Sequence, residues 1–541
     1  MPGSKIKKVK TLESENIGRT SRDDLWLYKI LMSQPLLLKV VILLVLTGTV
    51  SVVIGTLLGL ASFRDVGYPD SAILLRIDQF LLTGQIYHDP DAPPYLVTVY
   101  GPLTYAIHAI PYKLAQLIHI SPAILVRFAI VIELCFCIFF INRISRKIYD
   151  SSTIAKFSSF LAVSSVPLAF WATQIRGDFL ALAMSLLSVY LFVLSTKWRE
   201  IVLSAMCAGI ALIIKQTFFS APISVAIWLI YKRRFMHSFL WSTCVVLTVV
   251  AGYSYFYINE PLMLSNILIL QQPIIEYKEA LLILWDAASH PVVPFAMIGL
   301  FLSRWKRAQN GVFLLFYCIV AWLVAIVTVL QVGGNINYFW EPLMASAIFA
   351  GSAMYEMLQG RKVYNKFTAG ILLVWLLLSV KPMLFQQHFF WGTCYAKVGE
   401  GVINRQRWVR FFDTISGKYL LSTSPDITIL SKIPEIPDPF LNATLGLSGK
   451  WSSQPVVSRL ESGAYDLVVI WSGEAEQYDR FIYRGIRIWD DKMWRALRGE
   501  YRPACVFEGM EVWLPSHNSD EIFASLLGVG CLPMHTPNRG N

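Results

Sequence analysis

Residues 37–62, LLKVVILLVLTGTVSVVIGTLLGLAS, decide the fold class of this chain. The stretch is long enough for one helical crossing of a bilayer, because the hydrocarbon core needs about 20 apolar residues. Further apolar runs follow at 122–141, 154–172, 178–196, 201–214, 217–231, 237–258, 281–302, 311–330, 340–358 and 367–385. The sequence therefore predicts a polytopic α-helical membrane protein with about 11 transmembrane helices.

The composition agrees with this interpretation. The 541 residues are 55% hydrophobic and only 15% charged, and the mean hydropathy is +0.52. Since soluble globular proteins are about 25% charged, much of this chain must lie in a bilayer. A cytosolic enzyme, a disordered scaffold and a small disulfide-stapled secreted domain are all excluded as descriptions of the whole chain.

The basic residues predict the orientation. They gather in the tail 1–36 and in short connections between apolar runs, such as Arg143, Arg146 and Lys147. Cytoplasmic segments carry such an excess, so the net charge of +11 indicates topology rather than nucleic-acid binding. We expect a cytoplasmic N-terminus and an extracytoplasmic C-terminus.

Residues 101–119 test this scheme, because as a span they would place Arg143 and its neighbours outside. We expect them to form an amphipathic helix at the outer interface instead. Its residues at the wet level would be Tyr105, His108, Tyr112, Lys113 and His119.

The expected domains are a basic tail (1–36), a transmembrane region (37–385) with a first outer loop (63–121), and an extracytoplasmic α/β domain (386–541). In the last domain, runs at 426–431, 465–471 and 511–514 read as strands, and 490–498 reads as an amphipathic helix. Cys394, Cys505 and Cys531 lie beyond the last apolar run and could pair in an oxidising compartment. Asn442 begins a glycosylation sequon, which is too common a motif to carry weight alone.

An acidic residue stands at the start of an expected helix in the first outer loop. Asp70 follows a proline, and apolar residues continue at helical spacing until Gly84. Asp70 could be a helix N-cap, a general base at the membrane surface, or both. Asp65 is its competitor, and Asp78, Asp89 and Asp91 are weaker alternatives.

Other polar residues gather at the outer ends of later spans. Arg176 and Asp178 lie beside two apolar runs, where ionisable groups are costly and are either functional or paired. They could simply pair with each other, and Lys215, followed by Gln216, could be a lysine that extends to the surface. GGNINYFWEP, residues 333–342, combines glycines with Asn335, Asn337, Tyr338 and Glu341. Its aromatic residues alone would fit an interfacial belt, but a belt needs neither the asparagines nor the glutamate.

The order of these motifs resembles the C-type fold of membrane glycosyltransferases, in particular a bacterial branch with the aminoarabinose and protein O-mannosyl transferases. The resemblance rests on DSAILLRIDQFLLTGQIYHD (70–89), VYGPLTYAIHAIPY (99–112), QIRGDFLALAMSLL (174–187), IIKQTFF (213–219) and GGNINYFWEPLMASA (333–347). The tail adds YDLVVI (465–470) and EVWLP (511–515), which look like the extracytoplasmic domain of such enzymes.

This resemblance implies a sugar donor linked to a polyprenyl phosphate, and a glycan, lipid or protein acceptor. Asp70 would be the general base of an inverting transfer, and Arg176 and Lys215 would stabilise the developing phosphate charge. The implied substrate-binding residues are Asp65, Tyr100, Arg176, Asp178, Lys215, Gln216, Asn335, Asn337, Tyr338 and Glu341. Many relatives have two adjacent acids where this chain has Asp70 and Ser71, so we assign no metal ligand, and a divalent cation stays an open alternative. The implied location is a bacterial inner membrane.

Two other classes of function share part of the pattern. A polysaccharide polymerase or ligase is also polytopic, but it usually relies on Arg- and His-rich loops rather than an early acid. A lipid-linked sugar flippase or transporter would place ionisable groups at mid-membrane and show repeated halves.

Overall fold

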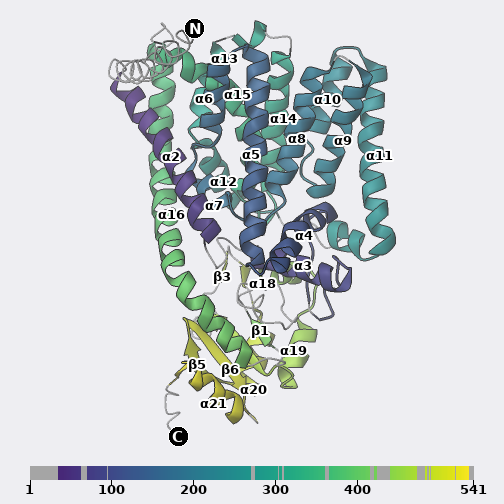
Figure 1. Cartoon of the computed structure of the whole chain (residues 1–541), viewed down its shortest axis with the longest axis vertical. Helices are drawn as coiled ribbons and strands as arrows, with labels where there is room; N and C mark the ends of the chain where they lie inside the picture. Colours follow the sequence, from purple (N-terminus) through teal and green to yellow (C-terminus); the bar gives the residue numbers. More distant parts are fainter. Residues whose placement is uncertain are drawn as a thin grey trace, which may run out of the picture.

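The computed structural model describes residues 35–61, 70–93, 95–195, 197–269, 275–302, 304–307, 310–359, 365–414, 420–422, 439–471, 482–483, 486–487, 489–517 and 519–534. These residues form a tall helical bundle with a smaller domain at one end (Figure 1). The bundle carries the apolar runs, and the small domain carries most of the strands.

The helices of the bundle and its outer loop follow one another along the chain. They are α2 (Leu36–Ala61), α3 (Asp70–Thr83), α4 (Pro102–Leu117), α5 (Pro122–Tyr149), α6 (Ser152–Ala162), α7 (Val166–Trp171), α8 (Asp178–Leu194), α9 (Trp198–Ile214), α10 (Ser220–Tyr231), α11 (Phe235–Asn259), α12 (Tyr277–Ala288), α13 (Val292–Phe301), α14 (Gly311–Val329), α15 (Trp340–Leu358) and α16 (Lys366–Thr414). A π-helix η1 (Ser265–Ile269) and the 3-10 helices η2 (Arg304–Arg307) and η3 (Ile336–Phe339) lie between them.

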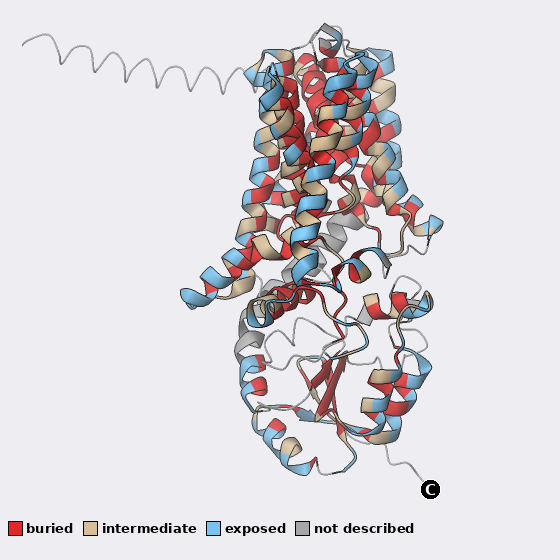
Figure 2. Cartoon of the chain, turned by 90° about the vertical axis from the view of Figure 1, so that its right-hand side faces the viewer, coloured by how far each residue is buried: buried red, intermediate tan, exposed pale blue. Residues whose placement is uncertain are grey.

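The apolar runs that the sequence predicts all fall on helices, but their number as spans differs from the expected count. Within the described residues, α2, α5, α11, α14 and the first part of α16 are long and apolar enough to cross a membrane, and a sixth span results if α12 and α13 are one. The expected count of about 11 is not confirmed. Exposed residues cover the outside of the bundle (Figure 2), and many are large and apolar, as expected for a surface that faces lipid.

Two of the apolar runs are interrupted by proline. The run 154–172 divides into α6 and α7 just before Pro167, and α12 and α13 meet at Pro291 with a bend of 66°. Proline cannot donate to the preceding turn and restricts the residue before it, so a helix breaks or bends there.

The helix that we expected at the outer interface exists as α4, but its faces are reversed. Tyr105, His108 and Tyr112 are buried inside the protein, whereas Ile110 and Leu117 are 70% and 67% exposed. The prediction that the three polar residues lie at the wet level is therefore wrong. Their hydroxyl and imidazole groups find partners inside the protein: His108 Nε2 lies 2.9 Å from Glu133 Oε1, for example. Lys113 and His119 are exposed, as expected.

The small domain is built around a five-stranded mixed sheet. Its strands are β1 (Leu420–Ser422), β2 (Leu467–Trp471), β5 (Tyr501–Phe507), β6 (Met510–Pro515) and β7 (Leu532–Pro533), and β3 (Ile482–Tyr483) pairs separately with β4 (Ile486–Arg487). The order is β1-β2-β6-β5-β7, in which only β1 and β2 pair in parallel. The helices are α18 (Pro439–Leu447), α19 (Gln454–Glu461), α20 (Asp491–Glu500) and α21 (Asp520–Gly528). The strands predicted at 465–471 and 511–514 and the helix predicted at 490–498 are confirmed, whereas 426–431 lies outside the described residues.

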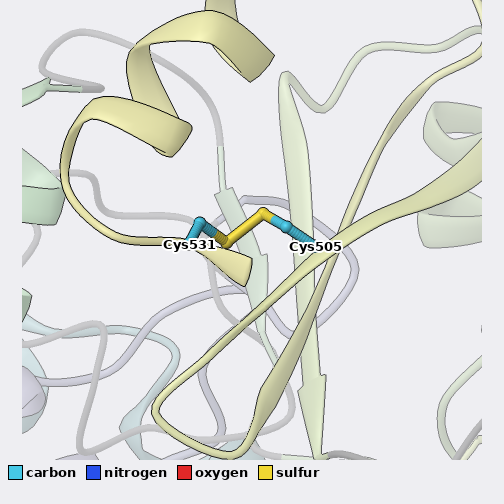
Figure 3. The surroundings of a disulfide bond; sticks show 2 residues. All are labelled: Cys505 and Cys531. Atoms are coloured by element: carbon cyan, nitrogen blue, oxygen red, sulfur yellow. A yellow bond between two sulfur atoms is a disulfide. The ribbon is translucent and has the colours of Figure 1, made fainter. Parts of the chain in front are cut away.

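A disulfide ties the end of this domain to its sheet. Cys505 of β5 bonds to Cys531, which follows α21 (Figure 3). Of the cysteines that we expected to be able to pair, these two do so. The bond fits an oxidising compartment.

The first outer loop connects the small domain to the bundle. On one side, Trp451 Nε1 donates to the Pro90 carbonyl over 3.0 Å, and Asn442 Nδ2 donates to the Tyr95 carbonyl over 3.4 Å. On the other side, Glu260 Oε2 accepts hydrogen bonds from the Ile86 and Tyr87 amides at 2.7 and 2.8 Å. The loop is therefore held between the two parts of the molecule, and Tyr100 lies in it just before α4. Asn442 is buried, so this sequon asparagine has a structural place in the fold.

Candidate active site

Asp70 opens α3 in the interior of the protein. Its side chain is 0% exposed. Oδ1 accepts a hydrogen bond of 2.9 Å from the Ile175 amide, and Oδ2 lies 3.4 Å from Arg127 Nη2. Both partners belong to other elements, so within the described part of the chain this carboxylate does more than cap its own helix.

The ionisation of Asp70 reflects this environment. Burial raises the pKa of the Asp70 carboxyl, while the charges of Arg127 and Arg176 and the hydrogen bond from the Ile175 amide act in the opposite direction. A carboxyl whose pKa lies above the usual range is better matched to proton transfer than an ordinary surface aspartate.

The turn between α7 and α8 positions Arg176 beside this carboxylate. The Arg176 guanidinium lies over the Trp171 ring, 4.6 Å from its centroid, and Nη1 contacts the Tyr100 hydroxyl at 3.4 Å. The next residue, Gly177, packs closely against α4: an added Cβ would lie 2.3 Å from Thr104 Oγ1. A side chain at this position would push the turn away from α4.

A second carboxylate, Asp178, opens α8 and lies among residues from two later elements. Its Oδ1 accepts hydrogen bonds from Lys215 Nζ and, over 2.8 Å, from Asn337 Nδ2. Lys215 Nζ also lies 4.7 Å from the centroid of the Tyr338 ring and 5.7 Å from that of Tyr100. The end of α9, the start of α8 and η3 therefore meet at Asp178.

Arg176 connects these two groups, because it interacts electrostatically with both Asp70 and Asp178. The connected ionisable residues are Asp70, Arg127, Arg176, Asp178 and Lys215. Two carboxylates and three cations leave one formal positive charge. Buried charges are costly unless they are compensated, so this arrangement favours an anionic ligand with a single charge.

Acceptor atoms remain open around Asp178. Among the described residues, Asp178 Oδ2 and Asn337 Oδ1 are buried and have no hydrogen-bond partner. Buried oxygens of this kind usually accept a hydrogen bond, from protein, water or ligand. A ligand with hydroxyl groups would satisfy both.

Not all of the predicted residues join this arrangement. Glu341 accepts hydrogen bonds from the hydroxyls of Ser185 (2.5 Å) and Tyr317 (2.9 Å), in a separate buried group. Asn335 Oδ1 accepts from the Ile336 amide over 2.8 Å and so caps η3. Gln216 is half-buried beside Lys215, and Asp65 lies outside the described residues. The geometry therefore brings together Asp70, Tyr100, Arg176, Asp178, Lys215, Asn337 and Tyr338, and leaves Glu341 and Asn335 in other roles.

The sequence analysis missed two members of this arrangement, Arg127 and Trp171. Arg127 could have been found, because it is a charged residue inside the 28-residue apolar helix α5, where an unpaired cation is expensive. Trp171 gives no such signal, since one more aromatic residue at the end of an apolar run is ordinary.

The described residues of this region do not form a metal site. Among the residues that the structure describes, no three His, Cys, Asp or Glu side chains form a cluster that could hold a metal ion.

The fold resembles solved membrane glycosyltransferases. ArnT from Cupriavidus metallidurans, in its apo state, shares 13% identity over 87% of this chain and 97% of that chain, with a TM-score of 0.56. ArnT from the same organism bound to undecaprenyl phosphate shares 11% identity over 88% of this chain and 98% of that chain, also with a TM-score of 0.56. A third structure is AglB, an oligosaccharyltransferase from Archaeoglobus fulgidus in complex with an inhibitory peptide and dolichol-phosphate. It shares 12% identity over 87% of this chain and 74% of that chain, with a TM-score of 0.47. No protein-family model and no curated protein sequence matches the chain.

The class of fold is therefore the one that the sequence motifs predicted. The chain is an integral membrane protein with the C-type glycosyltransferase fold, and it shares with ArnT nearly the whole length of both chains.

Proposed function

We propose that this chain is a glycosyltransferase that transfers a sugar from a polyprenyl-phosphate donor to an acceptor on the extracytoplasmic side of a membrane. The reaction is inverting, and Asp70 is its general base. We place the protein in a bacterial inner membrane with its C-terminal domain outside. The fold shared with ArnT supports the class, and the site supports the chemistry.

The observation that carries the proposal is the position of Asp70. A carboxylate with a raised pKa is held beside two arginines, at the end of the bundle that faces the small domain (Figure 1). A polyprenyl-phosphate sugar keeps its tail in the bilayer and its sugar at the level of the headgroups. Its reactive carbon therefore belongs at the depth where α3 and α5 meet.

The proposed reaction is a single displacement. The acceptor hydroxyl oxygen forms a bond to the anomeric carbon while the bond from that carbon to the phosphate oxygen breaks. The bonding electron pair leaves with the phosphate, and the hydroxyl proton passes to the Asp70 carboxylate. A phosphate is already a good leaving group, so no general acid is required.

The remaining side chains divide between the two ends of the donor. Arg176 and Arg127 supply the positive charge that stabilises the leaving phosphate. Lys215 is less suited to this task than we expected, because it bonds directly to Asp178, whereas Arg127 lies 3.4 Å from Asp70. The open oxygens of Asp178 and Asn337 instead accept hydrogen bonds from sugar hydroxyls, and Tyr100 and Tyr338 enclose the sugar.

The test uses the purified chain in liposomes with membranes and extracts from cells that lack the protein, which supply the accumulated donor and the unmodified acceptor. Asp70→Asn lowers sugar transfer by a factor of about 10²–10⁴, because it removes the base. Asp78→Asn is the matched control, since Asp78 lies on the same helix and accepts a hydrogen bond from the Tyr112 hydroxyl over 2.8 Å, which an amide oxygen also accepts. The control retains transfer.

The rival classes give other results. Movement of the lipid-linked sugar across the liposome without any sugar transfer would identify a flippase. Full transfer by Asp70→Asn would remove Asp70 as the base, and Asp65→Asn then tests its competitor in the same assay.

A further inference from the structure

We propose that a cleft between the first outer loop and the small domain binds the acceptor, and that the acceptor is a glycan. This inference rests on the proposed function, because it names the acceptor class and a binding site for it. The cleft has a volume of about 650 Å³, and its lining includes Asp91, Lys450, Trp451, Ser452, Gln454 and Ser458. The cleft is open to solvent, so it would contact one side of a ligand and leave the other side exposed.

The cleft is built across two parts of the chain. Asp91 comes from the loop between α3 and α4, whereas the other residues lie in α19 and the turn before it. The hydrogen bond from Trp451 Nε1 to the Pro90 carbonyl joins these two walls. The orientation of the tryptophan ring is therefore fixed with respect to the loop.

The chemistry of the lining suits a sugar. One face of a pyranose presents C–H groups that pack on an aromatic ring, and its hydroxyls both donate and accept hydrogen bonds. Trp451 offers a half-buried aromatic ring at the cleft. Around it stand a carboxylate acceptor (Asp91), an amide that both donates and accepts (Gln454), and two hydroxyls (Ser452 and Ser458).

A peptide or a lipid fits this lining less well. Extended peptides usually add to a free strand edge or to apolar side pockets. The described lining contains no strand, and Trp451 and Pro455 are its only large apolar side chains. A lipid chain would need a longer apolar surface, such as the one around α4.

The cleft also lies within reach of the candidate active site. The chain from Asp91 to Tyr100 spans nine residues, so the two ends are at most about 30 Å apart. Tyr95 and Val97 of this segment pack into clusters with the small domain, against Leu421 and Leu445 among others. A glycan bound in the cleft could therefore present its end to the site along a segment whose position is fixed.

The experiment measures the dependence of transfer on acceptor concentration for the full-length chain. The envelope of cells lacking the protein is separated into glycan, protein and lipid fractions, and each fraction serves as acceptor with membranes from the same cells as donor source. Ser458→Trp fills the cleft from an exposed position on α19, and Gln454→Ala removes an amide that lines it. Ser525→Trp is the matched control, because Ser525 is also an exposed helical serine of the small domain but lies on α21, outside the cleft.

We expect the glycan fraction to accept the sugar. Ser458→Trp should raise the KM for this fraction at least about tenfold and change kcat by less than about twofold, because it removes binding but not chemistry. Gln454→Ala should raise the same KM by a smaller factor, and Ser525→Trp should behave as the wild type. Thermal unfolding of each variant checks that the fold is retained.

Four outcomes would count against the proposals, and they are distinguishable. Transfer only to the protein or lipid fraction, or a wild-type KM for Ser458→Trp, overturns the glycan cleft and leaves the glycosyltransferase intact. An equal rise in KM for Ser525→Trp also overturns the cleft, since the effect would then come from any added bulk. Absence of transfer by the wild-type chain to all three fractions overturns the proposed function itself.

Discussion

Asp70 and Asp178 make an instructive pair, because they are similar residues in similar places with different partners. Each opens a helix at the same end of the bundle, and each is almost fully buried. Asp178 is held through Oδ1 by Lys215 and Asn337. Asp70 instead has a backbone amide on one oxygen and Arg127, at a longer 3.4 Å, on the other.

This difference in partners fits two different roles for the two carboxylates. A lysine that bonds directly to a buried aspartate holds its carboxylate in one position, so Asp178 is suited to orienting a ligand. The contact between Asp70 and Arg127 is at the limit of hydrogen-bonding distance. Asp70 can therefore exchange it for a contact with a substrate hydroxyl more readily than Asp178 can exchange its contact with Lys215. Three substitutions test whether the two carboxylates differ in this way.

The largest effect on stability is expected for Lys215→Met. The substitution removes the cation that bonds directly to the buried Asp178 carboxylate, so the free energy of unfolding should fall by about 3–5 kcal/mol. Denaturation in detergent measures the loss. The double variant Lys215→Met, Asp178→Asn should recover much of it, because it removes both charges. A single variant as stable as the wild type would show that the pair does not hold the site together.

A smaller effect is expected for Asn337→Leu. It removes one hydrogen bond to a charged oxygen, which contributes about 1.5–3 kcal/mol. It should also raise the KM for the donor, since Asn337 Oδ1 is one of the proposed sugar contacts. Asn335→Ala is the control: Asn335 caps η3, and its loss should cost about 1 kcal/mol without a change in donor KM. Equal changes in donor KM for both variants would argue against a sugar contact by Asn337.

For Arg127→Gln, the most informative expected consequence is on pH dependence. The base acts only when Asp70 is ionised, so transfer falls as the pH drops through the pKa of Asp70. Arg127 lowers that pKa, and its removal should therefore move the acid limb of the pH–rate profile to higher pH. A limb that stays in place, or moves to lower pH, would mean that another group controls it.

The sequence was sufficient for the fold class and for part of the site, and the reasons are physical. Apolar runs and short motifs are local signals, so the helices, the start of α3 at Asp70 and the strands β2 and β6 could be predicted. The partners of each side chain are not local. Arg127 lies 57 residues from Asp70 and Lys215 lies 37 residues from Asp178, and only the packing of helices brings them together.

The differences between the predictions and the structure have a related cause. The sequence of α4 shows two faces but does not show which of them packs against the protein. His108 belongs to the inner face because its partner, Glu133, is buried in the bundle. In the span count, hydropathy runs coincide with helices, but prolines divide two of them. Other apolar helices, such as α8 (17 residues) and α10 (12 residues), are shorter than the helices that qualify as spans. Glu341 appeared beside Asn337 in one motif, yet in a helix that begins at Trp340 it points to Ser185 and Tyr317 instead.

The most direct test of the account is a structure of the Asp70→Asn variant bound to its polyprenyl-phosphate sugar donor, since this variant should bind the donor and turn it over very slowly. We expect the anomeric carbon beside residue 70, the phosphate against Arg127 or Arg176, and sugar hydroxyls on Asp178 and Asn337. A donor whose sugar lies away from residue 70, or whose phosphate contacts neither arginine, would contradict the assignment of this site.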